Sequence, residues 1–425
     1  MRLNSKWNRR SFLGSVGMIA SSILPGSILT PRKLFGWNRG AAGATTPVSG
    51  FGHTGNPYEE LGVTTVINCE GTMTMLGGSL PHPELEAVMT MAGRHFVSIP
   101  EMEVAAGTRI AEMLKLPEGY TALVTSGAAA AIQSGLAGIL TGGEEALIQQ
   151  LPDLTGMKSE VIIQKSHRNP FDHQLRSTGI KLIEIETVDQ LRAAVNDRTA
   201  MMHFTNFANA AGQIKVDEFV KLAKQYNLPC MNDAAADTPP VSHLWDYTNM
   251  GYDLVTFSGG KAIRGPQCAG LLIGRKDMVA NALLNNSPHE DTLGRSQKVG
   301  KEEILGMVKA LELFLAEDHE ALAKEWQDRL EEISRELKKV PGVSTSFFVP
   351  DIANHVPHMS ITWDAARISL TPQQASKLLR NSKPSIVMGS GEDRPGLAMN
   401  SFMLQPGEDK IVSDQLSRLL REHAA

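Results

Sequence analysis

The sequence has no excess of positive charge and few cysteines. Its 425 residues include 41 Lys and Arg against 46 Asp and Glu, a formal net charge of −5. A protein that binds nucleic-acid phosphates usually carries a basic excess, so we expect no nucleic-acid partner. The three cysteines are far apart and none belongs to a C-x-x-C pair, so no disulfide framework or zinc site is indicated. Cys230 and Cys268 lie in apolar, strand-like stretches, and both are expected to be buried free thiols.

The chain also lacks an apolar run long enough to span a bilayer. Near the N-terminus, Phe12–Leu24 contains only small and apolar residues, but it is shorter than the ~20 residues that a membrane helix needs. Arg9-Arg10 precede it, polar residues follow, and Ala42-Gly43-Ala44 offers a late cleavage site. This layout predicts a twin-arginine signal, with export to the periplasm by the twin-arginine machinery. The alternatives are an N-terminal membrane anchor or a disordered basic tail.

Residues 1–50 are interpreted as this signal and a linker, and a regular pattern follows them. From Tyr58 onward, apolar runs alternate with helical stretches, which predicts an α/β fold with a mostly parallel sheet covered on both faces. We assign residues 51–285 to an N-terminal arm and a large domain. The expected strands are Thr121–Thr125, Val161–Gln164, Leu182–Ile185, Ala200–Phe204, Pro229–Asn232, Leu254–Phe257 and Gly270–Ile273, and the expected helices include Ala128–Leu140 and Val216–Tyr226.

Residues 286–425 have a different sequence pattern, which indicates long helices and a smaller C-terminal α+β domain. Charges alternate with Leu, Ile and Val over Glu302–Lys339, so this stretch is expected to be strongly helical. The other expected elements are the strands Met359–Trp363 and Gly396–Met399 and the helices Pro372–Arg380 and Asp409–His423.

Three short segments contain candidate chemistry, and the first is Thr125-Ser126-Gly127-Ala128. It follows a strand and begins a helix of small residues. The free N–H groups and positive dipole end of such a helix bind phosphate. Ser126 can add a hydroxyl, and Gly127 lets the backbone come close to a ligand. A simple tight turn between a strand and a helix would look the same.

The second segment places Asp233 where the apolar run Leu228–Met231 ends. Ligands of open α/β sheets bind beyond these strand ends, and a carboxylate there can pair with a protonated pyridine nitrogen. A helix-capping role is the alternative for Asp233, and Asp237 is a second candidate for the pyridine partner.

The third segment is Thr256-Phe257-Ser258-Gly259-Gly260-Lys261, in which a strand runs into a glycine turn and one lysine. A lysine that forms a Schiff base needs a firmly held backbone that comes close to its partner, and glycines permit this. Ser258 is a second candidate phosphate ligand. A phosphate loop, a carboxylate and a lysine, in this order, predict pyridoxal 5'-phosphate as the cofactor, with Lys261 as its Schiff-base lysine.

Several longer segments resemble one protein family. Together they extend from about Gly62 to the end of the chain, and they are similar to the selenocysteine-synthase-like branch of the pyridoxal-phosphate superfamily with the aspartate aminotransferase fold (fold type I). Within this branch, His167-Arg168-Asn169 and Phe402–Val412 resemble the D-glucosaminate-6-phosphate ammonia-lyase type more than the L-seryl-tRNA selenium transferases. The segments are Val66–Leu123, residues 125–132 (TSGAAAAI), 164–185 (QKSHRNPFDHQLRSTGIKLIEI) and 256–278 (TFSGGKAIRGPQCAGLLIGRKDM).

The resemblance implies roles for individual residues. It implies Lys261 and Asp233 as the catalytic pair, and a contact between His167 and the cofactor ring, with His173 as the competing histidine. A buried structural imidazole is the alternative for His167. It adds Asn206, in a Thr-Asn-Phe stretch that resembles Ser-Asn-Phe of the family. The other implied cofactor ligands are Ser126, Gly127, Ala128 and Ser258.

The sequence also departs from the selenium transferases. They carry an arginine near the final strand, where this chain has Asn400-Ser401-Phe402, so recognition of an amino-acid carboxylate at that position is in doubt. They also have an additional N-terminal tRNA domain, where this chain has a leader and a short arm.

These observations predict a lyase that eliminates ammonia from a small amino acid or amino sugar acid, with Lys261 as general base. Arg295 and Lys298 are candidates for holding an anionic group of the substrate. The alternatives are a selenium or sulfur transferase, an aminotransferase, and a non-catalytic binding protein with the same fold. The resemblance also implies a homodimer or a larger even-numbered homo-oligomer.

Overall fold

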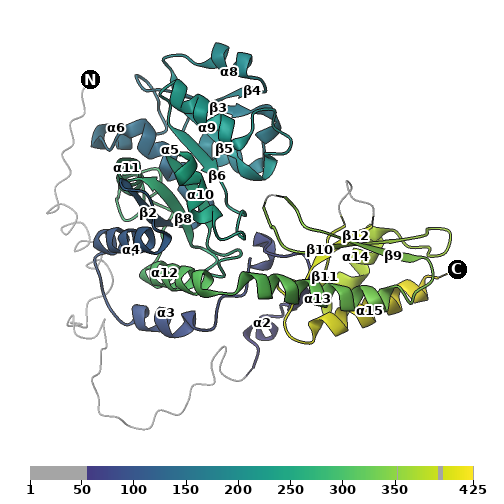
Figure 1. The fold of residues 1–425 in the computed structure, drawn as a ribbon. Helices are drawn as coiled ribbons and strands as arrows, with labels where there is room; N and C mark the ends of the chain where they lie inside the picture. Colours follow the sequence, from purple (N-terminus) through teal and green to yellow (C-terminus); the bar gives the residue numbers. More distant parts are fainter. Residues whose placement is uncertain (1–54, 352, 391–395, 425) are drawn as a thin grey trace, which may run out of the picture. The chain divides into compact units, whose positions relative to one another are not determined.

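The computed structural model describes residues 55–351, 353–390 and 396–424 (Figure 1). The signal and linker predicted for residues 1–50 therefore lie outside the described residues. The described residues before and after the division at Val63 belong to two units, and each unit is described by itself. The described part of the first unit contains α2 (Pro57–Glu60), where the Asn56 side chain accepts a hydrogen bond from Tyr58 N at 3.0 Å. None of the described helices is both long and apolar enough to cross a membrane.

The second unit contains a seven-stranded sheet in the order β2-β8-β7-β6-β5-β3-β4. Six of its strands point in the same direction, whereas β8 is antiparallel to both of its neighbours, β2 and β7. The seven predicted strands are confirmed, and their ends differ from the prediction by no more than two residues. The strands are β2 (Tyr120–Thr125), β3 (Glu160–Gln164), β4 (Lys181–Ile185), β5 (Thr199–Thr205), β6 (Cys230–Asp233), β7 (Leu254–Ser258) and β8 (Gly270–Arg275).

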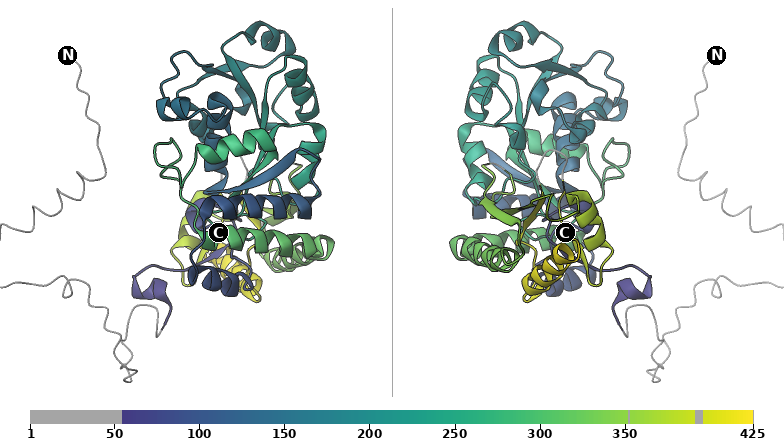
Figure 2. Two further views of the ribbon diagram at one scale, coloured as in Figure 1. Left: turned by 90° about the vertical axis from the view of Figure 1, so that its left-hand side faces the viewer. Right: turned by 90° about the vertical axis from the view of Figure 1, so that its right-hand side faces the viewer.

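Helices cover both faces of this sheet, because neighbouring residues of a strand point to opposite faces. On β5, Met201 packs with residues of α5 and α11, whereas Met202 packs with residues of α4 and α9. Figures 1 and 2 also show α12 running beside α3 and α4. The helices are α3 (Leu85–Gly93), α4 (Ile99–Leu114), α5 (Gly127–Thr141), α6 (Glu145–Gln150), α7 (His173–Arg176), α8 (Val188–Ala194), α9 (Val216–Gln225), α10 (His243–Met250), α11 (Lys276–Leu284) and α12 (Lys301–Ala316).

Small residues let α5 come very close to its neighbours. A Cβ at Gly138 would lie 2.6 Å from the backbone nitrogen of Ala282 in α11, so no larger residue fits there without a shift. This close packing holds the C-terminal half of α5 against α11.

The C-terminal part has a sheet of its own, in the order β12-β10-β9, with antiparallel pairing. The predicted strands there are confirmed, and the stretch Glu302–Lys339 is helical, as predicted. It consists of two helices, α12 and α13, because the side chain of Asp318 accepts a hydrogen bond from Ala321 N (3.0 Å) and starts a new helix. The elements are α13 (His319–Leu337), β9 (Val343–Phe348), β10 (His358–Trp363), α14 (Pro372–Arg380), β12 (Leu397–Asn400) and α15 (Glu408–Glu422).

A short parallel pair joins distant parts of the chain. Strand β1 (Val66–Asn68) pairs with β11 (Ser385–Val387), so the beginning of this unit belongs to the C-terminal core. The predicted domain boundary at residue 285 stays a prediction.

The three cysteines are free thiols, but only two of them are buried. Cys230 lies in β6, as expected. Cys268 is exposed, which corrects the prediction, because it belongs to a turn before β8 and not to a strand.

Candidate active site

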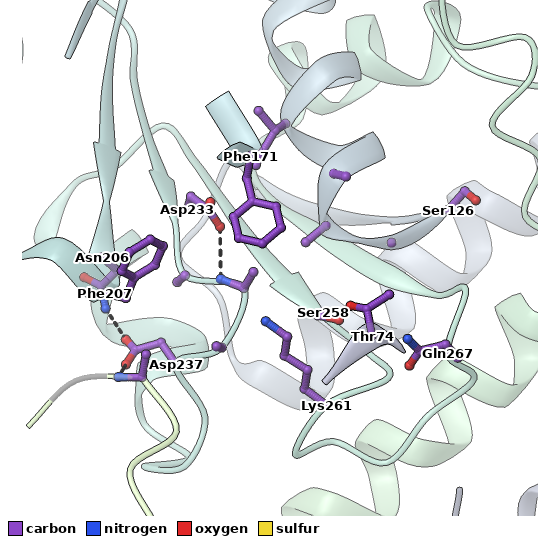
Figure 3. Close-up of a pocket in the computed structure, with 18 of the residues that line it drawn as sticks. Thr74, Ser126, Phe171, Asn206, Phe207, Asp233, Asp237, Ser258, Lys261 and Gln267 are labelled. Carbon is purple, nitrogen blue, oxygen red and sulfur yellow. Dashed lines mark hydrogen bonds between the residues drawn. The ribbon is translucent and has the colours of Figure 1, made fainter. Parts of the chain in front are cut away.

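A cavity of about 280 Å³ lies where several strands of the large sheet end (Figure 3). The parallel strands β5, β6 and β7 share this edge, and β2 ends there too because β8 is antiparallel to both β2 and β7. The residues that follow or close these strands line the cavity: Ser126 after β2, Asn206 after β5, Asp233 on β6 and Ser258 on β7. The fold therefore brings the three predicted segments together.

The N-terminus of α5 forms one end of the cavity, as predicted for a phosphate site. Ser126, Gly127 and Ala128 line the cavity, and no side chain caps the free N–H groups of this helix. Gly127 has a φ of +82°, which favours glycine. A Cβ at Gly270 would lie 2.5 Å from the carbonyl carbon of Gly127, so the loop is packed directly onto β8. The helix end can therefore donate hydrogen bonds to a phosphate.

Asp233 is a buried carboxylate whose pairing is incomplete. Its Oδ1 accepts from Ala235 N (3.2 Å) and from Thr256 Oγ1 (3.3 Å), and its hydrogen bonds to described residues leave Oδ2 unused. Burial raises the pKa of this carboxyl, although the hydrogen bond from Ala235 and the charge of Lys261 oppose the rise. A bound cation near Oδ2 would stabilise the charged form.

Lys261 points into the cavity from the turn between β7 and β8 (Figure 3). Burial lowers the pKa of its amine, and the nearby charge of Asp233 limits the fall. The turn is held by hydrogen bonds from Gly259 N to Ala269 O (2.9 Å) and from Gly265 N to Gly259 O (2.8 Å). A Cβ at Gly260 would lie 2.6 Å from Cα of Gln267. The glycines therefore allow a tight and firmly held lysine turn.

The histidine predicted to contact the cofactor ring does not line the cavity. His167 is fully buried: Thr205 N donates to its Nδ1 (3.2 Å), and its Nε2 lies 3.1 Å from Gln164 Nε2. Burial, with a smaller effect of the Lys215 charge, lowers its pKa to about 4. In this structure His167 packs edge-on against Phe204, and its contact with the cofactor stays a prediction. His173 is exposed at the start of α7 and does not line the cavity either.

Sequence reasoning missed Phe171, an aromatic residue that lines the cavity (Figure 3). It lies in the 3-10 helix η5 (Pro170–Asp172), which Asn169 caps by accepting from Phe171 N at 2.8 Å. The Asn-Pro pair was the available signal for a turn there. An aromatic side chain at this position can cover the face of a planar ring.

Asn206 belongs to a buried hydrogen-bonded cluster centred on Asp237, and both residues line the cavity. Asp237 accepts from the side chains of Asn206 and Tyr247, and its Oδ2 lies 3.0 Å from His243 Nδ1. Burial lowers the pKa of His243, but the hydrogen bond with Asp237 outweighs this effect and the pKa is raised. Because Asp237 already has these partners, Asp233 is the better partner for a ligand in the cavity.

The predicted substrate residues Arg295 and Lys298 do not line the cavity in this chain. Arg295 Nη1 donates to Ser287 Oγ (3.5 Å), and Lys298 is exposed. Their loop is tied to α5, because Asn285 Nδ2 donates to Thr141 Oγ1 (2.9 Å). Among the described residues that line the cavity, Lys261 is the one with a cationic side chain.

This set of residues fits pyridoxal 5'-phosphate. The free N–H groups of α5, with Ser126 and Ser258, suit a phosphate, and Phe171 suits the face of a ring. Asp233 has an unused oxygen for a pyridinium nitrogen, and the amine of Lys261 suits the aldehyde.

Comparisons with known proteins agree with this fit. The profile of the aminotransferase class-V family matches residues 99–391. D-glucosaminate-6-phosphate ammonia lyase of Salmonella typhimurium (strain 14028s / SGSC 2262) is 27% identical over 384 residues, which cover 88% of this chain and all of the relative. 5'-C-glycyluridine monooxygenase-decarboxylase of a Streptomyces species is 27% identical and covers 86% of this chain and 92% of the relative.

The L-seryl-tRNA(Sec) selenium transferase of Aquifex aeolicus (strain VF5) is 25% identical but covers only 52% of this chain and 55% of the relative. Among solved structures, D-glucosaminate-6-phosphate ammonia-lyase superposes with a TM-score of 0.75 at 25% identity, over 87% of this chain and 99% of that one. A sphingosine-1-phosphate lyase of Burkholderia pseudomallei K96243, with a TM-score of 0.53 at 14% identity, shares the fold. The chain therefore belongs to the aminotransferase class-V family of fold-type-I enzymes, and its cofactor is pyridoxal 5'-phosphate.

Proposed function

We propose that the protein is a lyase that eliminates ammonia from a small amino acid or amino sugar acid. The observation that carries this proposal is that Lys261 and Asp233 line the same cavity, whose residues fit the cofactor. The match to the ammonia lyase over its whole length supports the reaction class. The name of that ammonia lyase specifies a substrate with a phosphate. The described residues that line the cavity of this chain, however, offer no Arg and no second Lys to bind a phosphate. The proposal is therefore limited to the reaction and to a small amine.

The bound cofactor supplies an electron sink for a carbanion next to the substrate nitrogen. Asp233 would keep the ring nitrogen protonated, because its carboxylate is buried and has Oδ2 available. The lowered pKa of Lys261 favours the neutral amine, which can take a proton from the substrate as general base. Phe171 and Phe207 line the same cavity and would reduce the access of water to it.

The relatives carry names of different reactions, so the experiment must distinguish them. The holoenzyme is incubated with a panel of amino acids and amino sugar acids, and ammonia, keto acid, carbon dioxide and oxygen are measured. Equal amounts of ammonia and keto acid, without oxygen uptake or added acceptor, are expected. Keto acid formed only when a keto acid acceptor is added would make the protein an aminotransferase. Oxygen uptake with release of carbon dioxide would replace elimination by oxidative decarboxylation. The Lys261→Ala variant is the control.

We also propose that the protein is exported and that it forms a homodimer or a larger even-numbered assembly. The paired arginines and the apolar run after them support export. Large apolar side chains on α3, on α4 and between them support assembly, since Met91, Phe96 and Val104 are all exposed by more than half. Light scattering measures the assembly, and a fully active monomer would disprove it.

A further inference from the structure

A small recess lies next to Lys261 and is separate from the main cavity. It shares Lys261 and Ala236 with that cavity, and Gly71 and Asn400 also line it. Its volume is about 10 Å³, which is room for about one water-sized group. A group of this size, attached to an amine bound near Lys261, could reach the recess.

Asn400 lines this recess and carries an unsatisfied acceptor. The residue ends strand β12 and is only 4% exposed, and its Oδ1 has no hydrogen-bond partner. Its backbone is fixed, because Asn400 N donates to Cys69 O at 2.9 Å. A buried amide oxygen without a donor lowers stability, so such an atom is expected to meet a ligand or a water.

His358 determines which way the amide of Asn400 is turned. His358 Nδ1 lies 2.7 Å from Val356 O, and a carbonyl can only accept, so Nδ1 carries the proton. Asn400 Nδ2 lies 3.5 Å from His358 Nε2, and it donates to this atom when the ring is neutral, since Nε2 is then an acceptor. This arrangement leaves Oδ1, and not the NH₂ group, as the atom without a partner.

Gly71 keeps the space beside this amide open. It has a φ of +92°, and a Cβ there would lie 2.9 Å from Asn400 Nδ2 and 3.5 Å from Oδ1. A side chain at position 71 would therefore occupy the space beside the amide.

The chemistry of the recess selects a hydrogen-bond donor. An amide oxygen accepts from a hydroxyl and repels the oxygens of a carboxylate, and the described residues that line the recess include no cation besides Lys261. We propose that the recess binds one hydroxyl group of the substrate, with Asn400 Oδ1 as the acceptor, so that the enzyme selects hydroxylated amines. The proposal rests on the proposed function in that the substrate is an amine bound at Lys261.

Serine and 2-aminobutyrate test the recess, because they differ by a hydroxyl in place of a methyl group of similar size. Dissociation constants of both enantiomers of each are measured with the holoenzyme, by the change in cofactor absorbance and by calorimetry. Serine is expected to bind about tenfold more tightly than 2-aminobutyrate of the same configuration, the effect of one hydrogen bond. Equal binding of the two compounds to the wild-type protein would overturn the proposal.

Variants of Asn400 locate the effect. Asn400→Leu, which removes the acceptor at similar size, is expected to abolish the preference for serine, whereas Asn400→Asp, which keeps an acceptor oxygen, is expected to retain it. Asn381→Leu is the matched control, because it makes the same change at an exposed residue that follows α14 and lies outside the recess. It should keep the tenfold preference. A preference for serine that persists in Asn400→Leu would overturn the proposal. If Asn400→Leu does not fold, loss of the preference for serine in Asn400→Asp would overturn it.

These measurements separate the recess from the reaction. If serine binds more tightly through Asn400 but no compound of the panel releases ammonia, the proposed lyase activity fails and the recess stands. If ammonia is released but serine and 2-aminobutyrate bind equally, the recess fails and the lyase stands.

Discussion

Asp237 accepts a hydrogen bond from the backbone N–H of Ala353 at 3.0 Å, although 116 residues separate the two in the chain. The next residue strengthens this contact, because Asn354 N donates to Ala236 O at 2.8 Å. Ala353 and Asn354 both have positive φ values, which are unusual for residues other than glycine. The segment before β10 is thus fixed directly onto the turn that follows Asp233.

The first prediction concerns Asp237. Asp237→Asn replaces one acceptor oxygen by an NH₂ group, which would face the hydrogen-bond donors of neighbouring residues. The free energy of unfolding should therefore fall by about 2 kcal/mol or more. The measurement is urea unfolding of the holoenzyme. Asp414→Asn, at an exposed position of helix α15, is the control and should change stability by less than about 0.5 kcal/mol. An unchanged midpoint in Asp237→Asn would show that the cluster contributes little.

The second prediction concerns Lys261. Borohydride should attach the cofactor permanently to Lys261, as peptide mapping by mass spectrometry would show. Because burial lowers the pKa of this amine, uptake of the cofactor by the apoprotein should increase with pH and reach half its maximum below pH 10.5. A label on Lys276, which lies at the start of α11, would contradict the assignment.

The third prediction concerns Asp233. Asp233→Asn should leave the cofactor bound but lower kcat by about a hundredfold or more, because the ring nitrogen loses its charged partner. Cofactor content and turnover are measured on the same preparation. If turnover is unchanged, the role belongs to Asp237 or to no carboxylate.

The fourth prediction concerns Glu103, which is buried on α4 and accepts a hydrogen bond from Val124 N on the edge strand β2 at 3.2 Å. Burial raises its pKa to about 8, with Val124 opposing the rise. The folded state therefore binds the proton more tightly than the unfolded chain, and this contribution to stability is complete below pH 4.5 and lost as the pH rises through about 8. Glu103→Gln should remove this pH dependence and raise the thermal midpoint at pH 8.5. A lower midpoint at that pH would contradict the prediction.

The fifth prediction concerns the leader, which lies outside the described residues. Residues 1–50 fused to a reporter should direct its export only while Arg9 and Arg10 are both present. The Arg9→Lys, Arg10→Lys double variant should leave the reporter in the cytoplasm, as fractionation would show. Export of that variant would mean that the leader is of another kind.

The sequence by itself determined the elements of the large sheet and the residues at its strand ends. Ser126, Asp233 and Lys261 were found because each follows an apolar run with β-strand character, and these runs depend mainly on neighbouring residues. The carboxyl ends of parallel strands meet at one edge, so the common location of these residues follows from the pattern.

Only the tertiary structure decided which other side chains reach the cavity. His167 and Phe171 lie four residues apart in one irregular segment, and packing against Phe204 buries the histidine while the short helix η5 brings the phenylalanine to the cavity. Nothing in the local sequence indicates that Ala353 would bind Asp237 or that Asn400 would lie beside Lys261. Such contacts join segments more than a hundred residues apart, and they depend on how complete elements pack together, which no local pattern encodes.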